Sequence, residues 1–160
     1  MNESAVSARA PLEAASGSLR FQAARLIALA GRFPLSIHQL LFRLAIAGVF
    51  LRAGLTKISS WESTVALFAD EYKVPVLAPH LAAAMAASFE VGCSVLLLIG
   101  LGTRLAALPL IGMIMTIQLF VYPQAWSEHV VWGSILLFLV TRGGGALSLD
   151  HLIAHRFEKM

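Results

Sequence analysis

The stretch that decides the fold is residues 81–122, which read LAAAMAASFEVGCSVLLLIGLGTRLAALPLIGMIMTIQLFVY. It holds two apolar runs, each close to the roughly 20 residues that a helix needs to cross a bilayer. Between them lies Gly100-Leu-Gly-Thr-Arg104, and two glycines with an arginine are typical of a tight turn rather than of a helix interior. The stretch therefore predicts a helical hairpin with spans at about 81–101 and 105–122.

Two further apolar segments flank this hairpin, at about 35–55 and 125–141. The 160 residues are 58% hydrophobic and only 13% charged, which is about half the charged share of a soluble domain. We therefore expect an all-α membrane protein, a four-helix transmembrane bundle with short interfacial helices, whose transmembrane domain is 35–141. The single cysteine excludes a disulfide framework and Cys-paired metal motifs.

The basic residues predict the orientation of this bundle. If four spans leave both termini on one side, eight of the 12 Lys and Arg residues fall on that side, two on the other and two inside the first span. The positive-inside rule then makes residues 1–34 and 142–160 cytoplasmic tails of a multi-pass protein. Residues 19–33 of the first tail form either a cationic amphipathic helix on the inner leaflet or a plain positive anchor.

The segments outside the spans suggest surface helices. The outer loop, residues 58–79, carries apolar and aromatic side chains at helical spacing from Trp61 to Tyr72. This spacing predicts a short helix that anchors at the membrane interface and ends before the prolines at 75 and 79. In the C-terminal tail His151 and His155 could share a helix face, but no third ligand lies nearby, so no metal site is expected.

Three charged residues fall inside the predicted spans, namely Arg43, Arg52 and Glu90. Each costs about 2.5–3.5 kcal/mol to insert, so each needs a partner or a function. We expect a polar site between the helices in which Glu90 pairs with Arg43, with Arg52 as the alternative partner. The other interpretation is an ion pair that only fixes the packing of two helices.

Three more polar residues are candidates for the rim of this site: Lys57, Gln118 and His129. Gln118 adds a polar group to the third span, and a histidine such as His129 can accept or release protons near neutral pH. No residue pattern identifies a catalytic group or a known cofactor-binding motif.

Several short motifs follow one another in a specific order along the chain. They are Phe42-Arg-Leu44, Gly54-x-x-Lys57, Glu90, Gly100-Leu-Gly-Thr-Arg104, His129-x-x-Trp132 and Gly143-Gly-Gly-Ala-Leu-Ser-Leu-Asp150. Together they resemble the DoxX family of small four-helix membrane proteins, over about residues 40–153. The resemblance implies a bacterial inner-membrane protein linked to redox work, including quinone reduction. Two further segments, 70–75 and 118–126, look like a branch associated with copper or metal stress.

Three functions are open on this basis. The leading hypothesis is a redox-associated membrane subunit of a stress or metal-response system, with a redox or metal-response protein as partner. Quinone is the candidate ligand, and no other cofactor is evident; Arg43 would stabilise its reduced head group, and Glu90 would orient the arginine or relay protons. The alternatives are a non-enzymatic scaffold and a small-solute or proton permease formed by oligomerisation. The sequence does not decide whether the chain is an enzyme, and no nucleic-acid partner is expected.

Overall fold

The computed structural model describes residues 20–29 and 31–157, and these residues form helices and no strands. The chain divides into two units, Met1–Pro34 and Leu35–Met160. In the first unit residues 20–29 are helical and their side chains are exposed, while residues 1–19 of the predicted N-terminal tail lie outside the described residues. The prediction of an all-α protein is confirmed.

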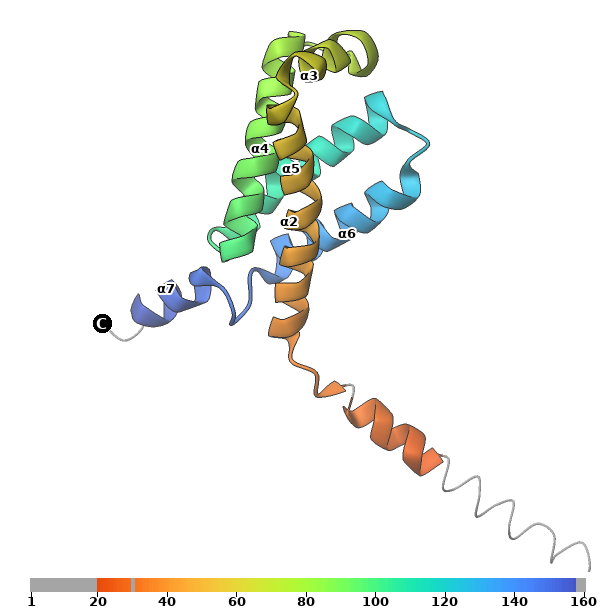
Figure 1. Ribbon diagram of the computed structural model, residues 1–160. Helices are drawn as coiled ribbons and strands as arrows, with labels where there is room; N and C mark the ends of the chain where they lie inside the picture. The colour runs from red at the N-terminus through yellow and green to blue at the C-terminus, as the bar shows by residue number, and fades with distance from the viewer. Residues whose placement is uncertain (1–19, 30, 158–160) are drawn as a thin grey trace, which may run out of the picture. The chain divides into compact units, whose positions relative to one another are not determined.

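The second unit contains the elements that build the site (Figure 1). In chain order they are α2 (Leu35–Ser59), α3 (Trp61–Leu67), the π-helix η1 (Phe68–Tyr72), α4 (Pro79–Ile99), α5 (Thr103–Thr116), the π-helix η2 (Ile117–Val121), α6 (Trp126–Arg142) and α7 (Leu149–Phe157).

The predicted hairpin is present as α4, a short turn, and α5 continued by η2. Gly100 ends α4 with φ of 72°, and Gly102 precedes α5 with φ of 57°, both in the left-handed region that glycine adopts without strain. Among the described residues, two helices are long and apolar enough to cross a membrane, Pro79–Ile99 and Thr103–Val121. They coincide with the two spans expected around this turn.

The core of the second unit forms where α2 packs along α4 and α5 packs against α6. Side chains from all four helices meet there, and the largest fully buried apolar ones are Ile46, Leu97, Leu110, Leu136 and Leu139. Alanines fill the narrow contacts between helices, and Ala47, Ala83 and Ala107 are completely buried. Small residues allow helix backbones to approach closely, which suits helices that pack in lipid.

The segment after the first predicted span differs from the expectation in two respects. Helix α2 continues to Ser59, so Lys57 lies within the helix and not in an outer loop. The aromatic residues expected at the membrane interface also have partners within the protein, because Phe68 is buried against Ala82 and Ala83 of α4. The aromatic spacing therefore marks a face that packs on another helix. Pro79, which was expected to end this segment, instead occupies the first turn of α4, where its missing N–H costs nothing.

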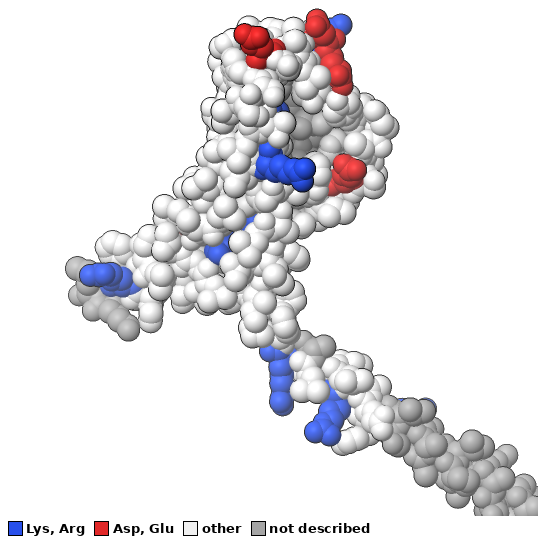
Figure 2. Space-filling view, in the orientation of Figure 1, with Lys and Arg blue, Asp and Glu red and all other residues white. Residues whose placement is uncertain are grey.

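Charged side chains are sparse over the second unit. Figure 2 shows a surface that is mostly uncharged, with the red acidic side chains gathered toward the end of the unit at which Figure 1 places α3. The exposed acidic residues of that region are Glu62, Asp70 and Glu71. Charges at buried positions are therefore the exception, and among the described residues they are Arg43 and Glu90.

Candidate functional site

The buried carboxylate of Glu90 pairs with Lys57. The ammonium Nζ of Lys57 donates hydrogen bonds of 2.8 Å to both carboxylate oxygens of Glu90, which joins α2 to α4. The side chain of Glu90 is 4% exposed and that of Lys57 is 19% exposed. Charge-assisted hydrogen bonds of this kind are roughly twice as strong as neutral ones, and burial makes a partner obligatory.

Gly54 allows this ion pair to form. A Cβ atom at Gly54 would lie 2.9 Å from Cβ of Glu90 and 2.8 Å from a methyl carbon of Val91, both closer than real Cβ contacts. The absence of a side chain lets α2 approach α4 closely at this level. Lys57 follows three residues later on the same helix face, so its side chain reaches Glu90.

A second polar pair joins η2 to α6. Nε2 of Gln118 donates to the carbonyl oxygen of Pro123 at 2.7 Å, and Oε1 of Gln118 lies 2.6 Å from Nδ1 of His129. Because Nε2 of Gln118 donates to Pro123, Oε1 of Gln118 is the atom that faces the His129 ring, and it accepts the hydrogen bond from Nδ1–H. His129 is buried, and this arrangement leaves its Nε2 as the atom available for a ligand.

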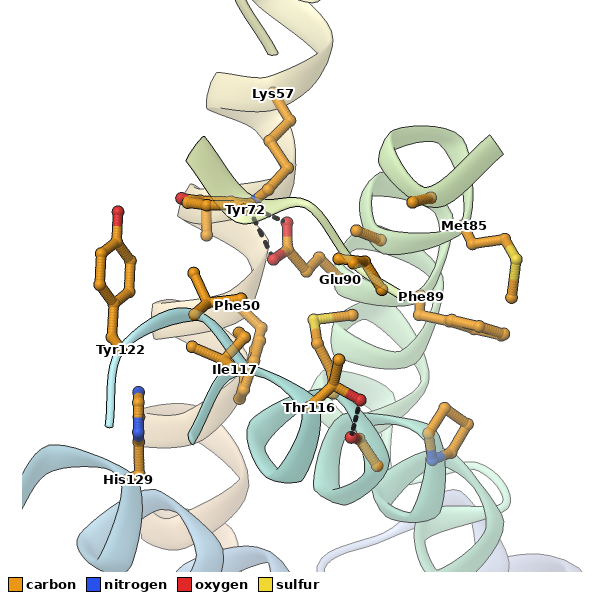
Figure 3. Close-up of a pocket in the computed structure, with 18 of the residues that line it drawn as sticks. Phe50, Lys57, Tyr72, Met85, Phe89, Glu90, Thr116, Ile117, Tyr122 and His129 are labelled. Atoms are coloured by element: carbon orange, nitrogen blue, oxygen red, sulfur yellow. Dashed lines mark hydrogen bonds and ion pairs between the residues drawn. The ribbon is translucent and has the colours of Figure 1, made fainter. Parts of the chain in front are cut away.

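The Lys57–Glu90 pair and His129 border one cavity of about 590 Å³ (Figure 3). Lys57, Glu90 and His129 all line it, and Figure 3 shows the ion pair below Tyr72 and the His129 ring on the opposite side. Most of the remaining lining is apolar, including Phe50, Met85, Phe89, Met113, Ile117 and Trp132. An apolar cavity with a few convergent polar groups is the usual form of a small-molecule site.

Two tyrosines stand at the edge of the same cavity. The rings of Tyr72 and Tyr122 meet edge to face with centroids 5.7 Å apart, and the Tyr122 hydroxyl donates to the carboxylate of Glu71. That hydrogen bond favours the neutral phenol and raises the pKa of Tyr122 above its ordinary value of 10.0. These contacts connect η1 to the segment that follows η2, so the two π-helices lie at the same end of the cavity. Single π-helical turns of this kind occur often at functional sites.

The expected Arg43–Glu90 pair is wrong. Arg43 is 1% exposed, but its guanidinium donates to the carbonyl oxygens of Gly144 at 3.1 Å and Leu147 at 2.9 Å. Gln39, one turn earlier on α2, donates to the carbonyls of Arg142 and Gly143. Arg43 therefore binds the turn after α6, away from the cavity, and its buried charge has a structural partner.

The residues of this turn also secure the α4–α5 hairpin. The carboxylate of Asp150 accepts hydrogen bonds from the backbone N–H groups of Gly102, at 2.6 Å, and Thr103, at 3.0 Å. The N–H of Asp150 in turn donates to the carbonyl of Gly100. The motif from Gly143 to Asp150 thus ties the C-terminal segment to the start of α5.

The alternative partner, Arg52, does not meet Glu90 either. Its side chain is exposed on α2 and does not line the cavity. The signal that would have identified Lys57 instead is its helical offset from Gly54, which places both residues on the buried face of α2. Of the six predicted site residues, Lys57, Glu90 and His129 line the cavity and Gln118 holds His129, whereas Arg43 and Arg52 do not line it.

The two C-terminal histidines are close to one another on α7. The rings of His151 and His155 stack with centroids 6.0 Å apart. Within residues 20–29 and 31–157, no group of three His, Cys, Asp or Glu side chains could hold a metal ion.

The fold and the cavity together define a class, that of small all-helical membrane proteins with a ligand-sized space between helices. The family model named DoxX matches residues 38–123 of the chain. The protein belongs to the DoxX family, a family of membrane proteins, as its short motifs predicted. The matched region contains Lys57, Glu90 and Gln118, and His129 lies beyond it. Searches of curated proteins and of solved structures returned no significant match.

Proposed function

We propose that this DoxX-family protein is a redox-associated membrane subunit whose cavity binds a quinone. The observation that carries the proposal is the cavity itself, with the Lys57–Glu90 pair on one side and His129 on the other. In this proposal α2, α4, α5–η2 and α6 all cross the bacterial inner membrane, and both termini are cytoplasmic. The excess of basic residues in the terminal segments supports that orientation.

The shape and chemistry of the cavity suit a quinone head group. Its volume of about 590 Å³ lies within the range of roughly 300–1,000 Å³ that holds small molecules. A flat ring would lie between apolar side chains such as Phe50, Phe89 and Trp132. Its two oxygens, at opposite ends of the ring, need polar groups on opposite sides, and the two polar pairs supply them.

The ion pair keeps its own side of the cavity neutral overall, and the remaining carboxylate of the lining is that of the exposed Glu128. Lys57 and Glu90 compensate one another, so an uncharged ligand pays no cost for approaching an isolated buried charge. The ammonium group of Lys57 has three N–H donors. Two of them donate to the carboxylate oxygens of Glu90, which leaves one donor for a ligand oxygen. Lys57 thus orients the ligand while Glu90 fixes the position of the ammonium group.

His129 is the group positioned for proton transfer. With Nδ1–H held by Gln118, the neutral ring presents a lone pair at Nε2. That atom can accept a proton from a hydroxyl group in the cavity, and the imidazolium so formed stays hydrogen-bonded to Gln118. A quinone supplies a two-electron, two-proton couple, so the proposal includes a redox protein as partner, in a stress or metal-response system.

A binding titration tests the proposal. The full chain in detergent is titrated with a short-chain ubiquinone while tryptophan fluorescence is followed, because Trp132 lines the cavity. We expect Glu90→Gln and His129→Leu each to weaken binding about tenfold, because the first no longer fixes the Lys57 ammonium group that faces the ligand and the second removes a hydrogen bond from Nε2. Glu62→Gln, an exposed change on α3, is the matched control and should bind as the parent does. Equal affinity in all four proteins would overturn the quinone site.

A further inference from the structure

A second, chemically different depression lies between α2 and α3. This α2–α3 groove, of about 550 Å³, carries a group of polar side chains within a partly apolar lining, namely Arg52, Thr56, Lys57, Ser60, Ser63 and Thr64. No aspartate or glutamate lines it. Arg52 and Lys57, with the hydroxyl groups of four serine and threonine residues and no acid, are the complement of an anion rather than of a neutral ring.

The charge in the groove belongs to Arg52. Both carboxylate oxygens of Glu90 already bind Lys57, so the charge of that ammonium group is compensated. Arg52 differs, because within residues 20–29 and 31–157 its guanidinium takes part in no ion pair or hydrogen bond. A guanidinium carries five donors in a planar fork, which matches the oxygens of a phosphate group.

Two of the hydroxyl groups have free donor protons. Thr56 and Thr64 use theirs on the backbone carbonyls of Arg52 and Lys57. Ser60 and Ser63 are exposed, and their side chains make no hydrogen bond within the described part of the chain. The groove therefore offers the guanidinium fork and two serine hydroxyls as donors for one tetrahedral oxyanion.

The surroundings of Arg52 indicate where that oxyanion comes from. Arg52 also borders a shallow apolar depression with Leu51 and Leu55, and Leu55 is 52% exposed. Ile58, one turn further on, is 54% exposed. Arg52 lies seven residues before Ser59, the end of α2, which is about 10 Å of helix and within the reach of a long side chain that extends toward the head groups. An anion flanked by exposed apolar surface in a membrane protein is a phospholipid.

We propose that the α2–α3 groove binds the phosphate of an acidic phospholipid, held by Arg52 and by the hydroxyls of Ser60 and Ser63. This site is separate from the cavity proposed for quinone and shares with it only the edge formed by Val49, Ala53, Lys57 and Tyr72. A lipid phosphate would supply Arg52 with the counter-ion that it lacks among the described residues.

Native mass spectrometry of the full chain in detergent tests this proposal, with phosphatidylglycerol, phosphatidylcholine and inorganic phosphate as probes. We expect one phosphatidylglycerol to be retained more tightly than phosphatidylcholine. Arg52→Gln should weaken its retention about tenfold, the loss of a charge-assisted hydrogen-bond pair. The double change Ser60→Ala with Ser63→Ala should weaken the retention of phosphatidylglycerol about threefold, which corresponds to the loss of one neutral hydrogen bond.

Arg156→Gln on the exposed part of α7 makes the same charge change and is the matched control. Retention of phosphatidylglycerol that is unchanged in Arg52→Gln, or lowered equally in Arg156→Gln, would overturn the site. If inorganic phosphate at millimolar concentration displaces the bound phosphatidylglycerol as effectively as added phosphatidylglycerol does, the ligand is not a lipid and the proposal is overturned. Because Arg52 is exposed, its substitution should leave the helical circular dichroism of the protein unchanged, which is checked alongside.

Discussion

Gly54 and Glu90 are in such close contact that a methyl group on the glycine would lie 2.9 Å from Cβ of the glutamate. This contact fixes how α2 and α4 pack at the level of the cavity. It also explains why a lysine three residues after the glycine, and not either arginine of α2, neutralises the buried carboxylate. The ion pair is therefore a product of helix packing as much as of charge.

The first prediction concerns this contact. Gly54→Ala should lower the free energy of unfolding by about 1–3 kcal/mol, because the added methyl meets Val91 and Glu90 and forces the helices apart. Gly48→Ala, on the same helix with nothing within 4 Å of the new Cβ, should be neutral or slightly stabilising. Unfolding by dodecyl sulfate in mixed micelles measures both, and equal losses would contradict the packing role of Gly54.

The second prediction concerns the ion pair. Lys57→Met leaves Glu90 buried without a partner and should cost about 3–5 kcal/mol of unfolding free energy. Adding Glu90→Leu should recover much of that loss, since two apolar side chains of similar volume need no compensation. The same unfolding assay gives the coupling energy as a double-mutant cycle. Losses that simply add would show that the two residues do not interact.

The third prediction concerns the C-terminal motif. Asp150→Ala removes the acceptor of two backbone N–H groups at the start of α5 and should cost about 0.5–2 kcal/mol of unfolding free energy. Quinone affinity should not change, because Asp150 does not line the cavity. Asp70→Ala, an exposed acid on η1, is the control and should stay within about 0.5 kcal/mol of the parent. A drop in quinone affinity without a drop in stability would contradict this structural role.

The fourth prediction concerns pH. The chain has only two tyrosines, so an ultraviolet titration can resolve them. Tyr122, whose pKa is raised mainly by its hydrogen bond to Glu71, should ionise later than an ordinary tyrosine. Its contribution to stability is complete below the unfolded pKa of about 10 and is lost as the pH rises through the higher folded value. Glu71→Gln should shift the late step toward lower pH, and a step that stays in place would contradict the assignment.

The fifth prediction concerns the topology. In a Cys93→Ser background, which removes the single native thiol, Asp70→Cys and Phe157→Cys each present one exposed thiol. A maleimide that cannot cross membranes should label position 70 in intact cells and position 157 only after permeabilisation. Labelling of both positions in intact cells would contradict the cytoplasmic C-terminus.

The helices could be predicted from the sequence because apolar runs and glycine turns are local signals. The hairpin between Gly100 and Arg104 and the end of α6 at Arg142 are examples. The partner of Glu90 could not be predicted in the same way. Ending the first span at residue 55 placed Lys57 in a loop, whereas α2 runs to Ser59. Pairing depends on which face of α2 meets α4, and that face is set by the close packing at Gly54.

For the two accessory residues, too, the residue could be predicted from the sequence and its partner could not. His129 and Gln118 were expected at the rim from their position and polarity, and both border or support the cavity. Their mutual hydrogen bond was not expected, because it depends on the π-helical turn of η2 and on the carbonyl of Pro123 that orients the amide. Sequence reasoning thus identified residues, while long-range geometry assigned their partners.

The hydrogen bonds of Arg43 have a consequence for synthesis. Its two carbonyl partners lie 101 and 104 residues later in the chain. At a translation rate of roughly 5–20 residues per second, about 5–20 s pass between the emergence of Arg43 and that of Gly144. Throughout that interval the guanidinium must remain hydrated or in contact with other polar groups. The contacts of Arg43 can therefore form only when the chain is nearly complete, which couples the final packing of α2 to the end of translation.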